Sequence, residues 1–172
     1  ALIFAIDRHV SDKGWATYVF DGRVWSGERP LDVPPLAALI DGAQIEAEAE
    51  VMIHDYYAAN AARLAVEFDE TNDTRLRALF GMYITHTAVP YGAVERLPRD
   101  LLEFAAAPTA HCGVYAVAQG RIYDALGLTW RMIIVDGGWH GLDEVLIDGW
   151  WETFDATNNI HIDISVGEML HG

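Results

Sequence analysis

The chain is poor in cysteine, in basic residues and in long apolar runs. Cys112 is its only cysteine, so no disulfide can form within the chain, and we expect a reducing, cytoplasmic environment. Only 11 Lys and Arg stand against 26 Asp and Glu, and the formal net charge of −15 disfavours nucleic acid and anionic membranes as partners. No apolar run approaches the ~20 residues of a membrane span, and the opening ALIFAID is too short for a signal-peptide core.

Apolar material is nevertheless sufficient for a folded core. Hydrophobic residues make up 52% of the chain and charged residues 22%, which is typical of globular proteins. A length of 172 residues corresponds to one ordinary domain. We therefore expect residues 1–172 to form a single domain.

Residue periodicity predicts that most helices precede the main sheet. Short strands are expected over 1–7 and 14–25, with a hairpin turn at Asp21-Gly22. Helical spacing or helix-start signals mark the ranges 34–40, 44–67, 72–85, 99–105 and 109–126. β-Branched and aromatic residues then concentrate in 129–135, 140–147 and 150–155. This order indicates an α+β fold, with N-terminal helices packed on an antiparallel β-sheet.

The only thiol stands where the last predicted helix begins. Thr109 is the expected cap, and residues 110–112 would fill the first turn. A helix N-terminus and a nearby imidazolium both lower the pKa of a thiol, which makes it a better nucleophile. A lone cysteine is more often a small buried hydrophobic residue, so a catalytic interpretation of Cys112 requires a histidine beside it.

A predicted hairpin supplies that histidine together with a carboxylate. Asp148-Gly149 is a strong two-residue turn, which places Ile147 opposite Trp150 and fixes the register of both strands. Side-chain alternation then puts His140 and Asp155 on one face as diagonal neighbours, roughly 7–8 Å apart between backbones. With a thiol at the helix start, these residues predict a Cys–His–Asp arrangement suited to nucleophilic acyl transfer.

These segments resemble the transglutaminase-like superfamily, whose core is related to papain-type cysteine proteases. The resemblance covers about residues 79–164 and rests on LLEFAAAPTAHCGVYAVAQGRIYDALGLTWR, HGLDEVLIDGWW and FDAT. The family shows a G-x-C nucleophile at a helix start, a HaW-x-EV strand, a Gly turn with a Trp, and a D-x-T motif. The resemblance implies a papain/transglutaminase-like core with Cys112, His140 and Asp155 as its catalytic triad.

Three departures from the family pattern concern the substrate pocket more than the triad. Ala110 stands where the family has Gly, GLTWR replaces a GiPaR-like stretch, and Gly141-Leu142 replace the usual Ala-Trp. The VPYG segment, by contrast, is similar to the family's upstream tyrosine region, which makes Tyr91 an oxyanion donor, a groove wall or a packing residue.

The resemblance implies a cysteine-nucleophile enzyme that acts on an amide in a peptide, a protein or a small molecule. The Cys112 thiolate would form an acyl-enzyme, His140 would protonate the leaving group, and Asp155 would orient His140. We favour hydrolysis; the alternatives are amide-forming transfer to an amine and a non-catalytic binding module of the same fold. This chemistry requires no metal or organic cofactor, and the oligomeric state stays open.

Other residues are candidates for substrate contact or for support of the site, namely Tyr91, Trp139, Trp151 and Glu144. Trp139 and Trp151 would wall an acyl cleft, whereas Glu144 shares the predicted face of the triad hairpin. His161 with Asp163 is the alternative base pair, because it repeats a His-x-Asp spacing. We expect no metal site, since the scattered histidines lack ligand spacing.

Overall fold

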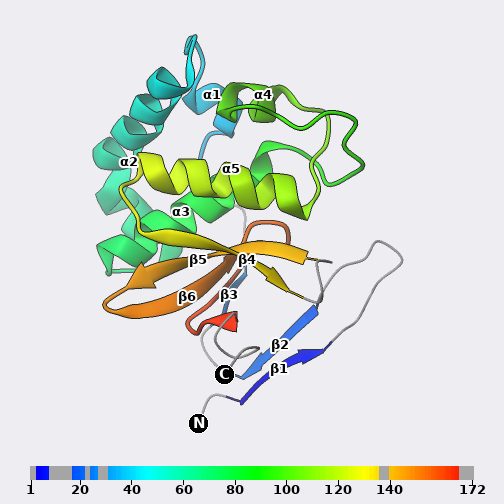
Figure 1. The fold of residues 1–172 in the computed structure, drawn as a ribbon. Coiled ribbons are helices and arrows are strands. Elements are labelled where there is room, and N and C mark those ends of the chain that lie inside the picture. The colour runs from blue at the N-terminus through cyan, green and yellow to red at the C-terminus, as the bar shows by residue number, and fades with distance from the viewer. Residues whose placement is uncertain (1–2, 8–16, 22–23, 27–30, 136–139, 167–172) are drawn as a thin grey trace.

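The computed structural model describes residues 3–7, 17–21, 24–26, 31–135 and 140–166 (Figure 1). The helices are α1 (Leu36–Leu39), α2 (Glu46–Phe68), α3 (Asp73–Ala88), α4 (Leu101–Ala106) and α5 (Cys112–Ala125). The strands are β1 (Ile3–Asp7), β2 (Thr17–Asp21), β3 (Val24–Ser26), β4 (Trp130–Val135), β5 (His140–Ile147), β6 (Trp150–Asp155) and β7 (Ile160–Ile162).

The main sheet has five strands in the order β3-β7-β6-β5-β4, and each neighbouring pair is antiparallel. Figure 1 shows the helices gathered on one side of this sheet, with α5 lying across β4 and β5. Strands β1 and β2 form a separate antiparallel pair on the other side. The predicted α+β class, with helices packed on an antiparallel sheet, is confirmed.

The β5–β6 hairpin has the predicted register. Ile147 lies opposite Trp150, and Asp143 lies opposite Phe154. The turn residues Asp148 and Gly149 have φ values of 51° and 87°, the left-handed conformations that a tight two-residue hairpin needs. A one-residue slip would move every side chain to the other face, so this turn determines which residues can meet.

The hairpin predicted at Asp21-Gly22 is wrong for the strands that the structure describes. β2 pairs with β1, and β3 pairs with β7, so the strands before and after Asp21-Gly22 belong to different sheets. Gly22 itself lies outside the described residues. An Asp-Gly signal marks a turn, but the partner of each strand is decided by long-range pairing.

The helix that carries the thiol begins later than expected, at Cys112, and its N-cap residue is His111. Thr109 does not cap it, because its hydroxyl donates to the carbonyl of Ala93. Ala110 is held in a short parallel bridge with Tyr91. These contacts keep the chain extended up to residue 111, and Cys112 becomes the first helical residue.

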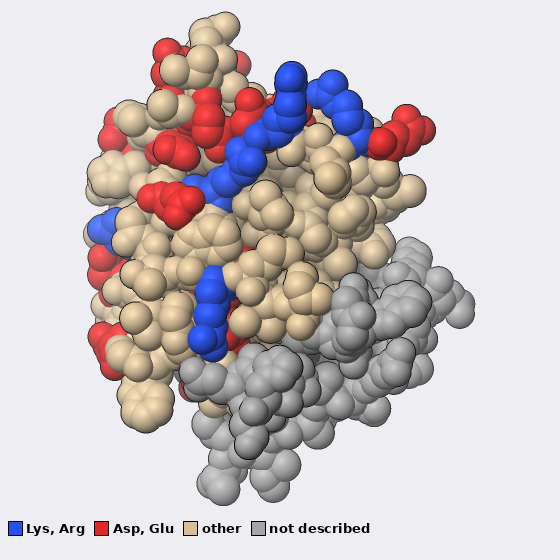
Figure 2. Space-filling model, in the orientation of Figure 1, with Lys and Arg blue, Asp and Glu red and all other residues tan. Residues whose placement is uncertain are grey.

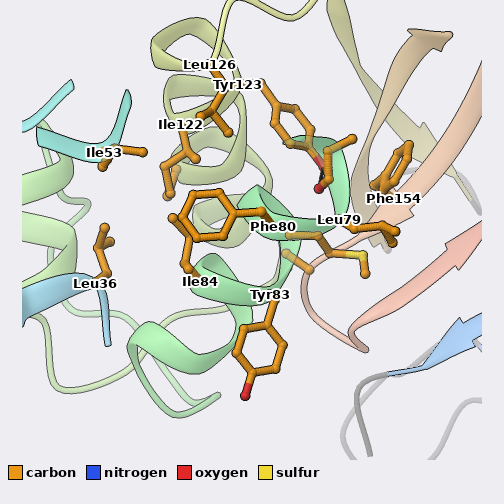
Figure 3. Packing of buried hydrophobic residues seen from close by; sticks show 14 of the residues in the cluster. Leu36, Ile53, Leu79, Phe80, Tyr83, Ile84, Ile122, Tyr123, Leu126 and Phe154 are labelled. Carbon is orange, nitrogen blue, oxygen red and sulfur yellow. Dashed lines mark hydrogen bonds between the residues drawn. The ribbon is translucent and has the colours of Figure 1, made fainter. Parts of the chain in front are cut away.

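Helix α5 is packed against other elements on two sides, and eight of its 14 residues are buried. Ile122, Tyr123 and Leu126 project from it toward the side chains of α3, including Phe80 (Figure 3). The fully buried hydroxyl of Tyr123 donates to the carbonyl of Ala78 at 2.9 Å. Close packing of this kind restricts rotation and sliding of the helix, so the position of its first residue is well determined.

On its other side, α5 packs closely against β4 through a glycine. A Cβ on Gly120 would overlap the six-membered ring of Trp130. The Trp130 indole Nε1 donates to Asp124 Oδ1 at 2.7 Å, which fixes the ring against the helix. The absence of a side chain at Gly120 therefore sets the distance between the thiol helix and the sheet.

We predict that Gly120→Ala lowers the free energy of unfolding by about 1–3 kcal/mol, because the added methyl overlaps the Trp130 ring. In a Trp130→Leu background the same substitution should instead raise stability by about 0.5–1 kcal/mol, since alanine favours helix over glycine. Urea unfolding of the four proteins measures this coupling. An equal loss in both backgrounds would contradict the packing assigned to Gly120.

Candidate active site

The thiol of Cys112 is half-buried at the first residue of α5. A hydrogen bond with His140 makes the largest contribution that lowers the pKa of Cys112, and backbone hydrogen bonds from Gly141 and Gly113 add to it. Burial acts in the opposite direction but is outweighed. The site therefore favours the thiolate form, which is the nucleophilic form of cysteine.

His140 and Asp155 meet across the hairpin, in a buried hydrogen bond of 2.8 Å between Nε2 and Oδ2. Burial alone would lower the pKa of His140, but the charge and hydrogen bond of Asp155 raise it to about 10, with a further contribution from Cys112. Burial alone would raise the pKa of Asp155. The charge and hydrogen bond of His140, together with hydrogen bonds from Asn158, outweigh burial, and the pKa is lowered.

These contacts connect the three residues in series, from Cys112 through His140 to Asp155. Because His140 directs Nε2 at Asp155, its other ring nitrogen, Nδ1, is the atom that faces Cys112. The pKa of the thiol moves down and that of the imidazole moves up, so the site favours a thiolate beside an imidazolium. Such a pair can attack a carbonyl carbon and donate a proton to the group that leaves.

Tyr91 lies beside the thiol. Its segment is held by two backbone hydrogen bonds of 3.0 Å, from Gly92 to the Ala110 carbonyl and from Ala110 to the Pro90 carbonyl. The Tyr91 ring stacks on Tyr115, with centroids 6.5 Å apart. Burial and the negative charge of Cys112 raise the pKa of the Tyr91 phenol. The hydroxyl therefore stays protonated at neutral pH and is a hydrogen-bond donor next to the site.

Glu144 and Trp151 belong to a cluster farther along the hairpin. The fully buried Glu144 accepts hydrogen bonds from Arg131, Thr153 and Ser165. The Arg131 guanidinium lies 4.2 Å from the centre of the Trp151 ring. Glu144 lies four positions along β5 from His140, a distance of about 13 Å. Glu144 thus stabilises the hairpin that presents the triad. Trp139 lies outside the described residues.

The alternative base, His161, has a different carboxylate partner from the expected Asp163. Its Nε2 lies 2.9 Å from Glu152 Oε1, and its ring stacks on Phe154 at 4.4 Å. Glu152 also accepts hydrogen bonds from the Arg75 guanidinium at 2.9–3.2 Å. His161 is therefore part of a buried structural ion network.

Two residues near the triad were missed by sequence reasoning. Asn158 donates its side-chain amide to Asp155 Oδ2 at 2.8 Å and its backbone N–H to Oδ1 at 3.3 Å. The spacing of Asp and Asn within a short polar turn is a signal that could have indicated it. Asp143 is completely buried, and neither of its carboxylate oxygens has a hydrogen-bond partner among the described residues.

Burial, together with the nearby charge of Asp155, raises the pKa of Asp143 well above its usual value. The raised pKa favours the neutral carboxylic acid form of Asp143 behind the triad. In this state it adds no second negative charge to the carboxylate that orients His140.

The chain matches no protein-family model, no curated protein and no solved structure. Of the helices in the described residues, none combines the length and apolarity needed to cross a bilayer. Across the same part of the chain, no three His, Cys, Asp or Glu side chains come together in a way that would hold a metal ion. Site geometry therefore carries the functional proposal.

We predict that iodoacetamide alkylates native Cys112 at about pH 6 at least tenfold faster than the same thiol in urea-unfolded protein, whose pKa is about 8.5. His140→Ala removes the main interaction that lowers the pKa of Cys112, so it should slow alkylation at pH 6 and have little effect at about pH 9. Intact-mass spectrometry follows the reaction. Equal native and unfolded rates at pH 6 would contradict an activated thiol.

A second prediction concerns Asp143. Its folded-state pKa is raised, so the folded protein binds one more proton than the unfolded chain from about pH 4 upward, and rising pH costs stability at up to about 1.4 kcal/mol per unit. Asp143→Asn removes this cost. The stability difference between variant and parent should therefore grow from pH 4 to 7. Asp41→Asn, at an exposed position, is the control, and a difference that is constant with pH would contradict the assignment.

Proposed function

We propose that this chain is a cysteine-dependent acyl-transfer enzyme of the papain/transglutaminase-like type, and that it hydrolyses an amide. The observation that carries the proposal is the series of contacts from Cys112 to His140 and from His140 Nε2 to Asp155 Oδ2, the second a hydrogen bond of 2.8 Å. A buried structural thiol would need neither an imidazole nor a carboxylate behind it. The packing of a nucleophile helix on the antiparallel strands that carry the base supports the fold assignment.

In the first half-reaction, the Cys112 sulfur forms a bond to the substrate carbonyl carbon and the carbonyl π electrons move to oxygen. The backbone N–H of Cys112 and the hydroxyl of Tyr91 are the donors we assign to this oxyanion. As the tetrahedral intermediate collapses, the C–N bond breaks and His140 Nδ1 gives its proton to the departing amine. The product is an acyl-enzyme and a neutral His140.

In the second half-reaction, His140 Nδ1 takes a proton from a water molecule that attacks the thioester carbonyl. The C–S bond then breaks, the acid leaves, and the thiolate–imidazolium pair is restored. Asp155 keeps the ring in one orientation throughout, and Asn158 keeps Asp155 in place. The Asp155 carboxylate exchanges no proton in these steps.

Water is the favoured acceptor because transfer to an amine requires a dry cleft that excludes it. The aromatic residue Trp151 covers Arg131 rather than the thiol, and Trp150 is 75% exposed beside the hairpin turn. Among the described residues, these tryptophans do not wall the nucleophile.

The test is to incubate the protein with peptide anilides, esters and thioesters, and to read acylation of Cys112 by intact-mass spectrometry and release of the leaving group by absorbance. We expect an acyl-enzyme that turns over to free acid. His140→Ala and Asp155→Asn should each lower kcat/KM by about 10²–10⁴-fold, without loss of folding. His54→Ala is the matched control, because His54 also contacts an aspartate but is exposed on α2.

Two results would count against this function. Absence of acylation with every donor would favour a binding module. Activity that survives His140→Ala but is lost in His161→Ala would place the base elsewhere. Adding a primary amine separates the acceptors, since product partition that saturates with amine would show transfer in place of hydrolysis.

A further inference from the structure

A cavity of about 300 Å³ opens beside the thiol, between α5, α4 and β4. His111 and Gly113, the two neighbours of Cys112 in sequence, lie in its wall. From there the wall continues along one stripe of α5 through Val117 to Arg121, about 12 Å by helical rise. The cavity therefore adjoins the first turn of α5, where Cys112 lies, and has the length of a bulky side chain or a short acyl group.

The cavity is apolar along almost its whole length. Its walls include Leu97, Phe104, Val114, Val117 and Met132. Leu97 is 64% exposed, Val117 43% and Met132 37%, so apolar surface stands in water and would gain from being covered. Figure 2 shows that the surface over α5 and β4 includes an area without charged side chains, which lies between basic side chains.

The charged residues in the lining already have partners. Asp100 accepts the backbone N–H of Glu103 at 2.8 Å as the cap of α4, and Arg121 lies 3.7 Å from Glu46. Both charges therefore serve the surrounding structure, and the middle of the cavity offers contacts to carbon rather than to a charged group.

Two glycines, Gly141 and Gly113, lie where β5 approaches the start of α5. A Cβ on Gly141 would lie 3.2 Å from the Met132 methyl and 3.6 Å from the Gly113 Cα. A Cβ on Gly113 would lie 3.3 Å from the His111 ring. Side chains at these positions would displace the Met132 methyl and the His111 ring by a few tenths of an ångström, and both Met132 and His111 line the cavity.

We propose that this cavity binds an apolar side chain of the acyl donor, adjacent to the carbonyl that Cys112 attacks. The enzyme therefore selects aliphatic or aromatic acyl donors over small or charged ones. That the ligand is an acyl donor rests on the proposed function. The cavity itself is tested without acyl transfer, and a volume of about 300 Å³ is at the lower limit of known ligand pockets, suited to one bulky group.

The experiment compares chloroacetamides whose nitrogen carries a methyl, an isobutyl, a benzyl or a carboxymethyl group. Each rate of Cys112 alkylation is divided by the rate of the same probe with a free small thiol. The isobutyl and benzyl probes should show saturation and react about tenfold or more faster than the methyl probe, because burying several carbons is worth at least one factor of ten. The carboxymethyl probe should gain nothing.

Val117→Glu should remove the advantage of the apolar probes, so that the isobutyl and benzyl probes react no faster than the methyl probe. Val51→Glu is the matched control, since Val51 occupies the equivalent sixth position of α2 and is 57% exposed. Equal normalised rates for all four probes in the parent protein would overturn the proposal, as would equal losses in the two variants. An apolar advantage that disappears as protein concentration rises would overturn it too, because a second copy would then occupy the cavity.

Failure of this proposal and failure of the proposed function give different results. If the probes are discriminated but no donor acylates Cys112, the cavity binds apolar groups and the proposed enzymatic function is wrong. If donors acylate Cys112 with no preference for apolar groups, the proposed enzymatic function holds and the cavity does not select the donor.

Discussion

The buried hydrogen bond between His140 and Asp155 is the interaction on which the site depends. It forms only if β5 and β6 pair in one register, and that register is set by the left-handed turn at Asp148 and Gly149. It also holds a positive charge on His140 in a place where burial would remove it. Without that charge, the thiol at the start of α5 would lose the main interaction that lowers its pKa.

The rest of the structure supplies the rigidity that this bond requires. α5 is fixed on one side by Tyr123 against α3, and on the other by the close approach of Gly120 to Trp130. Farther along the hairpin, Glu144 gathers Arg131 and two hydroxyls, so its buried charge is satisfied. The exception is Asp143, whose raised pKa favours the protonated acid beside the triad, so that its cost in stability rises with pH.

The core of the site follows from short-range rules, which is why the sequence predicts it. A two-residue turn determines pairing for several residues on each side, so the juxtaposition of His140 and Asp155 could be derived by counting. The start of α5 was predicted too early, because Ala110 pairs with Tyr91, a long-range contact with no local signal. The partners of β2 and β3, the state of Asp143 and the cavity beside Gly113 depend likewise on segments distant in sequence.

The central claim is that Cys112 and His140 form a thiolate–imidazolium pair at neutral pH. Nitrogen-15 NMR of the histidine rings measures it most directly, with His140 assigned by comparison with His140→Gln. The account predicts that both ring nitrogens of His140 carry protons at pH 7, consistent with a pKa of about 10, and that Asp155→Asn lowers that pKa. A His140 ring that loses its proton near pH 6.5, as an unperturbed histidine does, would contradict the account.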